Sequence, residues 1–149
     1  MANSYPVIRT KVRTPRRHSG LVRRQRLIDF LHGAIEHRLI LLAAGAGYGK
    51  TSLLIDYAHD TYLPVCWYSL DSYDGHVATF VEYLVASIRE RFPHFGASVL
   101  QALAAFEGSE ADVEPFVRLL VNEIEEHIHQ YFVLILDDYH EIIDCEAVN

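Results

Sequence analysis

The chain has 149 residues, 50% of them hydrophobic, and a formal net charge of −7, so its length and apolar content predict one domain with a buried core. The longest apolar run, residues 39–46, is far shorter than the ~18 residues of a membrane-spanning helix, and no signal peptide is recognisable, so a soluble, cytoplasmic protein is expected. The two cysteines, Cys66 and Cys145, have neither the number nor the spacing of a disulfide framework or a zinc site.

Charge is unevenly distributed along the chain. Residues 1–38 contain nine Lys or Arg and two acids, whereas the remainder contains four Lys or Arg and eighteen acids. A basic amino-terminal arm, residues 1–22, therefore precedes an acidic body, residues 23–149. We expect the arm to pack on this body. Nucleic-acid binding by the arm is the alternative, although no aromatic residues interleave its arginines.

The first predicted helix covers residues 22–37, where apolar side chains recur at helical spacing. Its apolar positions are Leu27, Phe30, Leu31, Ala34 and Ile35. The next six residues, 39–44, are all apolar and predict a strand that is buried on both faces.

A glycine-rich loop and a helix start follow this strand, and residues 39–52 read LILLAAGAGYGKTS. The pattern fits G-x-x-x-x-G-K-[ST], except that Ala44 occupies the position of the first glycine. Backbone amides of the loop would surround a β-phosphate, and Lys50 would bridge the β- and γ-phosphates. Thr51 would bind Mg²⁺, and Ser52 would reach the α-phosphate. The predicted nucleotide-binding residues are Gly45, Ala46, Gly47, Tyr48, Gly49, Lys50, Thr51 and Ser52.

The alternative for this stretch is a glycine-rich turn whose Lys-Thr pair begins a helix by chance. Two features favour phosphate binding: the apolar run before the loop, and the helix predicted from Lys50 to about His59 after it.

Further strands and helices are predicted in the middle of the chain. Residues 63–70 (LPVCWYSL) predict a second strand, and a turn containing Asp71 and Asp74 follows it. Apolar positions then predict helices over residues 77–88, 99–106 and 113–128, with Gly108 ending the middle one. Glu123, Glu125 and Glu126 are expected on the solvent side of the last helix. His127 and His129 are interpreted as surface histidines rather than a metal pair, because they point in different directions.

The last predicted strand, residues 131–138 (YFVLILDD), ends in two carboxylates. Asp137 would hold Mg²⁺ through a water molecule, and Asp138 would orient the attacking water as the candidate catalytic residue. A strand that runs into an acidic turn is common, so this signal is weak alone; its combination with the glycine-rich loop favours function. His140 and Glu141 either flank the γ-phosphate or face water.

Taken together, these elements predict an α/β fold: a P-loop NTPase-type parallel sheet with flanking helices, of which three core strands are readable.

Five short motifs in this order carry a family resemblance. They are KVRTP at residues 11–15, LVRRQRL at 21–27, GYGKT at 47–51, WYSLD at 67–71 and LDDYH at 136–140. Residues 9–144 thereby resemble the amino-terminal ATPase domain of the MalT-like, LuxR-type transcriptional regulators, which belong to the STAND class of signal-transduction ATPases. The resemblance implies that Arg24 lies near the nucleotide, so that the basic arm can also pack there. It is also the sole basis for expecting ATP rather than GTP.

What the resemblance implies is an ATP- and Mg²⁺-binding switch in a transcription regulator. The family continues into a sensor strand, a winged-helix region, helical repeats and a DNA-binding helix-turn-helix, so residues 23–149 are expected to be a partial domain. From this we expect negligible ATP hydrolysis by this chain alone, a tendency to self-associate, and DNA contact only through a further domain. A non-catalytic interaction fragment is the alternative.

Overall fold

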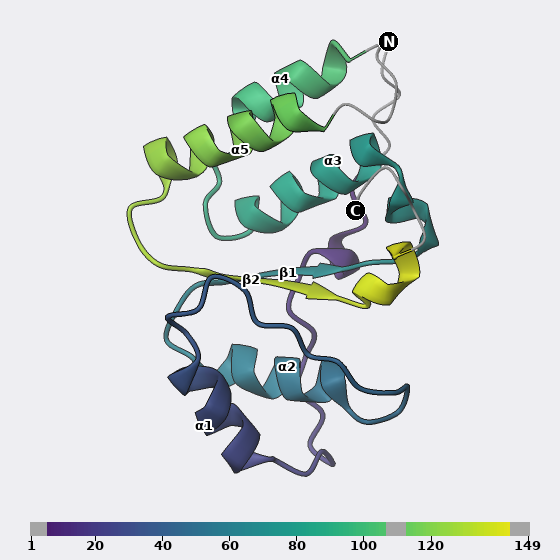
Figure 1. Ribbon diagram of the computed structural model, residues 1–149, viewed down its shortest axis with the longest axis vertical. Helices are drawn as coiled ribbons and strands as arrows, with labels where there is room; N and C mark the ends of the chain where they lie inside the picture. Colours follow the sequence, from purple (N-terminus) through teal and green to yellow (C-terminus); the bar gives the residue numbers. More distant parts are fainter. Residues whose placement is uncertain (1–5, 107–112, 144–149) are drawn as a thin grey trace.

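The computed structural model describes residues 6–106 and 113–143, with a sheet between two groups of helices. Two parallel strands, β1 (Val65–Ser69) and β2 (Val133–Asp137), make the central layer. They pair in register from Val65 opposite Val133 to Ser69 opposite Asp137. Helices cover both faces of this sheet (Figure 1). The fold is therefore mixed α/β, with both faces of its strands covered as parallel pairing requires.

Helices α1 (Gln25–Gly33) and α2 (Lys50–Asp60) lie on one face of the sheet. Alternate strand residues point toward them, so Val65, Trp67 and Ile135 pack with Ile55 of α2. A second cluster joins the two helices to each other, and its buried members are Ile28, Leu31, Leu53 and Tyr57. This face fixes the position of α2 relative to both strands.

Helix α3 (Val77–Arg89) lies on the opposite face, and α4 (Ala97–Ala104) and α5 (Glu114–His127) pack beyond it (Figure 1). The main hydrophobic core lies among these helices and the adjacent strand residues. Its buried members are Cys66, Val77, Val81, Val85, Ile88, Phe95, Val99, Phe116 and Ile128. The helical spacing seen in the sequence thus marks the packed faces of α3 and α5.

Most predicted elements occur near their predicted positions. The helices predicted at residues 22–37, 50–59, 77–88, 99–106 and 113–128 correspond to α1 through α5, and the strands predicted at 63–70 and 131–138 correspond to β1 and β2. The turn at Asp71 is a short 3-10 helix, η2 (Ser72–Gly75), with a capping box between Asp71 and Asp74. The expected helix stop at Gly108 lies outside the described residues.

The prediction of a strand at residues 39–44 is wrong. Two of the three expected core strands are therefore present in the described part of the chain. The segment is irregular, and Leu39 and Leu41 are 83% and 80% exposed. Leu42 packs against the α1–α2 cluster together with Val133. A strand is stabilised by its ladder of backbone hydrogen bonds, and the carbonyl of Ala44 instead accepts a hydrogen bond from Lys50.

Glu123 was expected on the solvent side of α5, and this expectation is also wrong because the residue is only 4% exposed. Its carboxylate accepts hydrogen bonds from the backbone amides of Gly96 (2.8 Å) and Ser98 (2.7 Å) and from the Ser98 hydroxyl (2.5 Å). It therefore caps the start of α4 from a neighbouring helix. Glu125 and Glu126 are exposed as expected, as are His127 and His129.

The basic arm packs on the acidic body, one of the two placements expected for it. A 3-10 turn, η1 (Arg9–Lys11), places Lys11 Nζ 2.6 Å from Asp74 Oδ2 and 3.0 Å from Asp71 Oδ2. Further along the arm, Arg13 pairs with Glu90 at 2.9 Å and Arg17 pairs with Asp56 at 2.6 Å. These contacts run along the molecule from η2 to α2, following the purple trace in Figure 1.

In the described ranges 6–106 and 113–143, no helix is both long and apolar enough to cross a membrane.

Removing the Glu123 carboxylate should destabilise the fold, because two buried backbone amides at the start of α4 would lose their acceptor. We expect Glu123→Ala to lower the free energy of unfolding by about 2 kcal/mol, the usual effect of losing a helix cap and leaving buried donors unpaired. Urea unfolding measures this loss. Glu126→Ala, an exposed change on the same helix, is the control, and equal effects of the two substitutions would contradict the capping role.

Candidate functional site

Two segments that are far apart in the sequence meet at one edge of the sheet. Because β1 and β2 are parallel, both strands end at this edge, and α2 begins there. The Thr51 hydroxyl, in the first turn of α2, donates a hydrogen bond to Asp137 Oδ1 at the end of β2, over 3.0 Å. The predicted Mg²⁺-binding pair, separated by 86 positions in the chain, is therefore in direct contact.

The glycine-rich loop before α2 has the backbone conformation that its glycines allow. Gly47 and Gly49 have φ angles of 80° and 74°, in the left-handed region that side chains other than glycine rarely adopt. Residues 45–48 are exposed, and the Tyr48 ring lies over Gly45, where an added Cβ would be 3.1 Å from it. The loop is thus an open turn with its backbone accessible.

Lys50 folds back onto this loop. Its ammonium donates hydrogen bonds to the carbonyl oxygens of Ala44 (2.6 Å) and Gly45 (3.0 Å). Because α2 begins at Lys50, the first backbone amides of this helix have no acceptor within the helix itself. Unpaired amides at a helix start attract anions, because they carry the positive end of the helix dipole.

Arg24, which the family resemblance assigns to the surroundings of the nucleotide, lies against the same loop. Its guanidinium donates to the carbonyl oxygen of Tyr48 at 3.1 Å and to that of Gly49. A Cβ at position 49 would lie 2.9 Å from Arg24 Nη2. Glycine is favoured at position 49 by the positive φ angle, whereas the end of the flexible Arg24 side chain could move away from an added Cβ. A second positive charge thus lies at the loop beside Lys50.

The two aspartates at the end of β2 have different environments. Asp137 is 5% exposed, and burial raises the pKa of its carboxyl group although the Thr51 hydrogen bond acts in the opposite direction. Asp138 has a φ angle of 59° and a side chain that is 48% exposed. The structure therefore separates a buried carboxylate that contacts Thr51 from an exposed one.

The sequence left open whether His140 and Glu141 flank a phosphate or face water. In the structure the two side chains lie close to each other. They lie in the 3-10 turn η3 (Tyr139–Ile142), and His140 Nε2 is 3.2 Å from Glu141 Oε1. His140 Nδ1 is 3.9 Å from Asp138 Oδ1, so the exposed aspartate lies at the edge of this pair. Asp138, predicted as catalytic, is thus on the outer side of the turn, whereas Asp137 lies on the side of Thr51.

Sequence analysis missed one network behind this site. Asp74 of η2 is fully buried, receives the Lys11 ammonium and accepts a hydrogen bond from the backbone amide of Asp71. The turn η2 packs against η3, and Leu70 donates its amide to the Asp137 carbonyl at 2.9 Å. The D-x-x-D spacing of Asp71 and Asp74 is the sequence signal for this capping box.

The available donors and acceptors match a phosphate group and a hard divalent cation. Two positive groups, Lys50 and Arg24, lie against the loop. A hydroxyl and a carboxylate, both oxygen ligands of the kind that Mg²⁺ prefers, meet at its end. Ser52 follows Thr51 in α2 and is partly buried, and Ala46 is part of the exposed loop.

No model of a known protein family matches the sequence.

Burial of Asp137 predicts a stability change that needs no ligand. A carboxyl group whose pKa is raised by folding favours its protonated form, so its contribution to stability is present at low pH and lost as the pH rises through the raised pKa. Asparagine resembles the protonated form and can still accept from Thr51. We therefore expect Asp137→Asn to raise the Tm of the ligand-free protein at pH 7.

The same substitution should have less effect as the pH falls toward the ordinary aspartate value of 3.8. Asp138→Asn, at an exposed position, is the matched control and should leave Tm nearly unchanged. Scanning calorimetry at several pH values measures both variants. A lower Tm for Asp137→Asn at pH 7 would show that the buried charge stabilises the free protein, contrary to this account.

Proposed function

We propose that this chain is the ATP- and Mg²⁺-binding module of a signal-transducing transcription regulator of the MalT-like, LuxR type, in which the nucleotide acts as a switch. The observation that carries the proposal is the hydrogen bond between Thr51 and Asp137. In a phosphate-loop protein these two side chains hold the metal from the loop and from a neighbouring strand. A chance glycine-rich turn would have no reason to place its threonine against that aspartate.

Triphosphate binding is supported by the charges and amides around the loop. Lys50 and Arg24 occupy carbonyl oxygens of the loop, and a phosphate is a stronger partner for a cation than a neutral carbonyl. In the proposed complex Lys50 leaves Ala44 and Gly45 for the β- and γ-phosphates, and amides of residues 45–52 donate to the phosphate oxygens. Arg24 keeps the loop close to the start of α1.

Mg²⁺ binding is supported by the Thr51–Asp137 pair. When bound, the metal would neutralise charge on the β- and γ-phosphate oxygens. Thr51 and Asp137 would hold it, and the proton affinity of buried Asp137 makes this step pH-dependent. Since a metal binds the ionised carboxylate and the pKa of Asp137 is raised by burial, Mg²⁺ affinity should decline at a higher pH than for an ordinary aspartate.

The finer parts of the proposal rest on motif order. ATP rather than GTP, the regulatory role and the water-orienting role of Asp138 all follow from the resemblance to the MalT-like ATPase domains. Direct binding of nucleic acid by the arm is less well supported, because Lys11, Arg13 and Arg17 are paired with acids of the body. Those cations would have to exchange their partners for phosphates.

The phosphate loop is tested by Lys50→Ala. Removing the cation that would contact the β- and γ-phosphates should weaken ATP binding by about 100-fold, which corresponds to about 2.7 kcal/mol. Isothermal titration calorimetry with Mg·ATP measures the change. Arg26→Ala, which removes an exposed positive charge from α1, should bind like the parent. Parental affinity in Lys50→Ala would rule out the phosphate-loop assignment.

The metal assignment is tested by comparing the two aspartates. Asp137→Asn should abolish most of the gain in ATP affinity that Mg²⁺ provides, whereas Asp138→Asn should retain it, because only Asp137 contacts Thr51. ATP titrations of each variant with Mg²⁺ and with EDTA measure that gain. If Asp138 proves to be the metal-sensitive residue, the roles assigned along LDDYH are reversed.

A further inference from the structure

A pocket lies at the other edge of the sheet, away from the phosphate loop. It has a volume of about 250 Å³ and is formed by four separate parts of the chain. The arm contributes Val12, Arg13 and Thr14, the end of α2 contributes His59, β1 begins at Val65, and Glu90 and Arg91 follow α3. The proposed nucleotide site does not use any of these residues.

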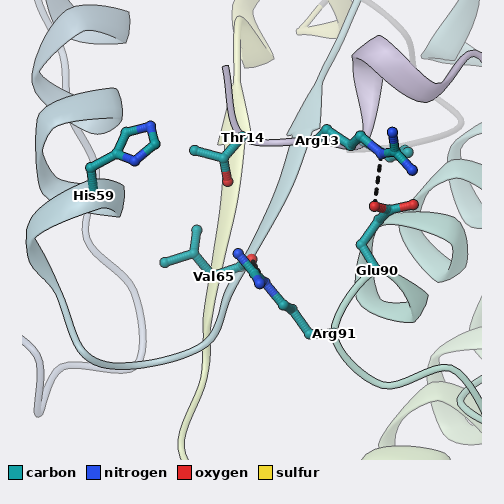
Figure 2. A pocket seen from close by; sticks show the side chains of 7 residues that line it. Arg13, Thr14, His59, Val65, Glu90 and Arg91 are labelled. Atoms are coloured by element: carbon teal, nitrogen blue, oxygen red, sulfur yellow. Dashed lines mark hydrogen bonds and ion pairs between the residues drawn. The ribbon is translucent and has the colours of Figure 1, made fainter. Parts of the chain in front are cut away.

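The pocket has an apolar floor and a positively charged wall. Val12 and Val65 are buried beneath it. Arg13 is directed toward Glu90 and pairs with it at 2.9 Å (Figure 2), so those two charges compensate each other. Arg91 donates its Nε–H to the Val65 carbonyl at 3.0 Å, and no carboxylate of the described residues pairs with it. Its terminal guanidinium nitrogens are therefore the unbalanced charge of the pocket.

Two further polar groups line the pocket. Figure 2 shows the Thr14 hydroxyl pointing to the side on which the Arg91 guanidinium lies, with the His59 ring farther away on α2. His59 Nε2 is 3.0 Å from the Pro15 carbonyl, which ties the arm to α2 beside the pocket. A guanidinium held at Nε keeps a pair of N–H groups for a carboxylate, and a nearby hydroxyl can donate to the same group.

We propose that this pocket is a binding site for a small organic carboxylate, whose charged group lies on Arg91 and Thr14 and whose apolar part covers Val12 and Val65. The volume is below that of sites for drug-sized ligands, roughly 300 Å³ or more, so a short-chain acid fits the pocket. Because the arm forms one wall and the body forms the others, the ligand holds the arm in place. The arm then continues to Arg24 at the phosphate loop.

Butyrate is a suitable probe, with sodium chloride at the same ionic strength as the reference. Butyrate should raise the Tm of the protein, and calorimetric titration should give a saturable isotherm. Arg91→Gln should weaken binding at least tenfold, and Arg91→Lys, which keeps the charge without the planar fork, should weaken it less. Thr14→Val keeps the side-chain shape and should weaken butyrate binding severalfold. This variant tests the proposal if Arg91→Gln does not fold.

Two controls separate this site from the phosphate loop and from general charge effects. Lys50→Ala should bind butyrate like the parent, so failure of the nucleotide proposal leaves this one standing. Arg118→Gln removes an exposed charge on α5 and should also bind normally. Equal Tm shifts with butyrate and chloride, or parental butyrate affinity in both Arg91→Gln and Thr14→Val, would overturn the proposal.

Discussion

Parallel pairing of β1 with β2 is the constraint on which the rest of the structure depends. Two parallel strands cannot be joined by a tight turn, so the chain between them must cross over the sheet and return. Here α3, α4 and α5 form that crossover on one side of the sheet, while α1 and α2 lie on the other. The pairing also brings both strand ends to one edge, which is why Asp137 can meet Thr51 at the start of α2.

The polar groups of the candidate site form hydrogen bonds with neighbouring groups of the chain. Lys50 and Arg24 are satisfied by loop carbonyls, and the Thr51 hydroxyl is satisfied by Asp137. Burial of Asp137 nevertheless disfavours its ionised form. A buried carboxylate that costs stability in the free protein is typical of a position kept for its chemistry. Binding of a cation there would compensate the cost.

Sequence reasoning succeeded where the pattern was long or the spacing was regular. The apolar periods of α3 and α5 identified those helices, and the strand followed by LDDYH identified β2 with its carboxylates. It failed at residues 39–44 because an apolar run does not by itself supply a hydrogen-bonded neighbour. Leu39 and Leu41 are exposed, and only Leu42 of that run packs in the α1–α2 cluster. It failed at Glu123 because the charge pattern of one helix contains no information about an adjacent helix start.

The central claim is that Thr51 and Asp137 form one metal site beside a triphosphate. Mn²⁺ can replace Mg²⁺ at oxygen ligands, and it broadens the NMR signals of nuclei close to it. Backbone amide spectra of the protein with ATP and substoichiometric Mn²⁺ therefore locate the metal directly. The account predicts selective broadening of residues 49–52 together with residues 136–138. Broadening of neither group, or of the exposed acids around His140 without residues 49–52, would contradict it.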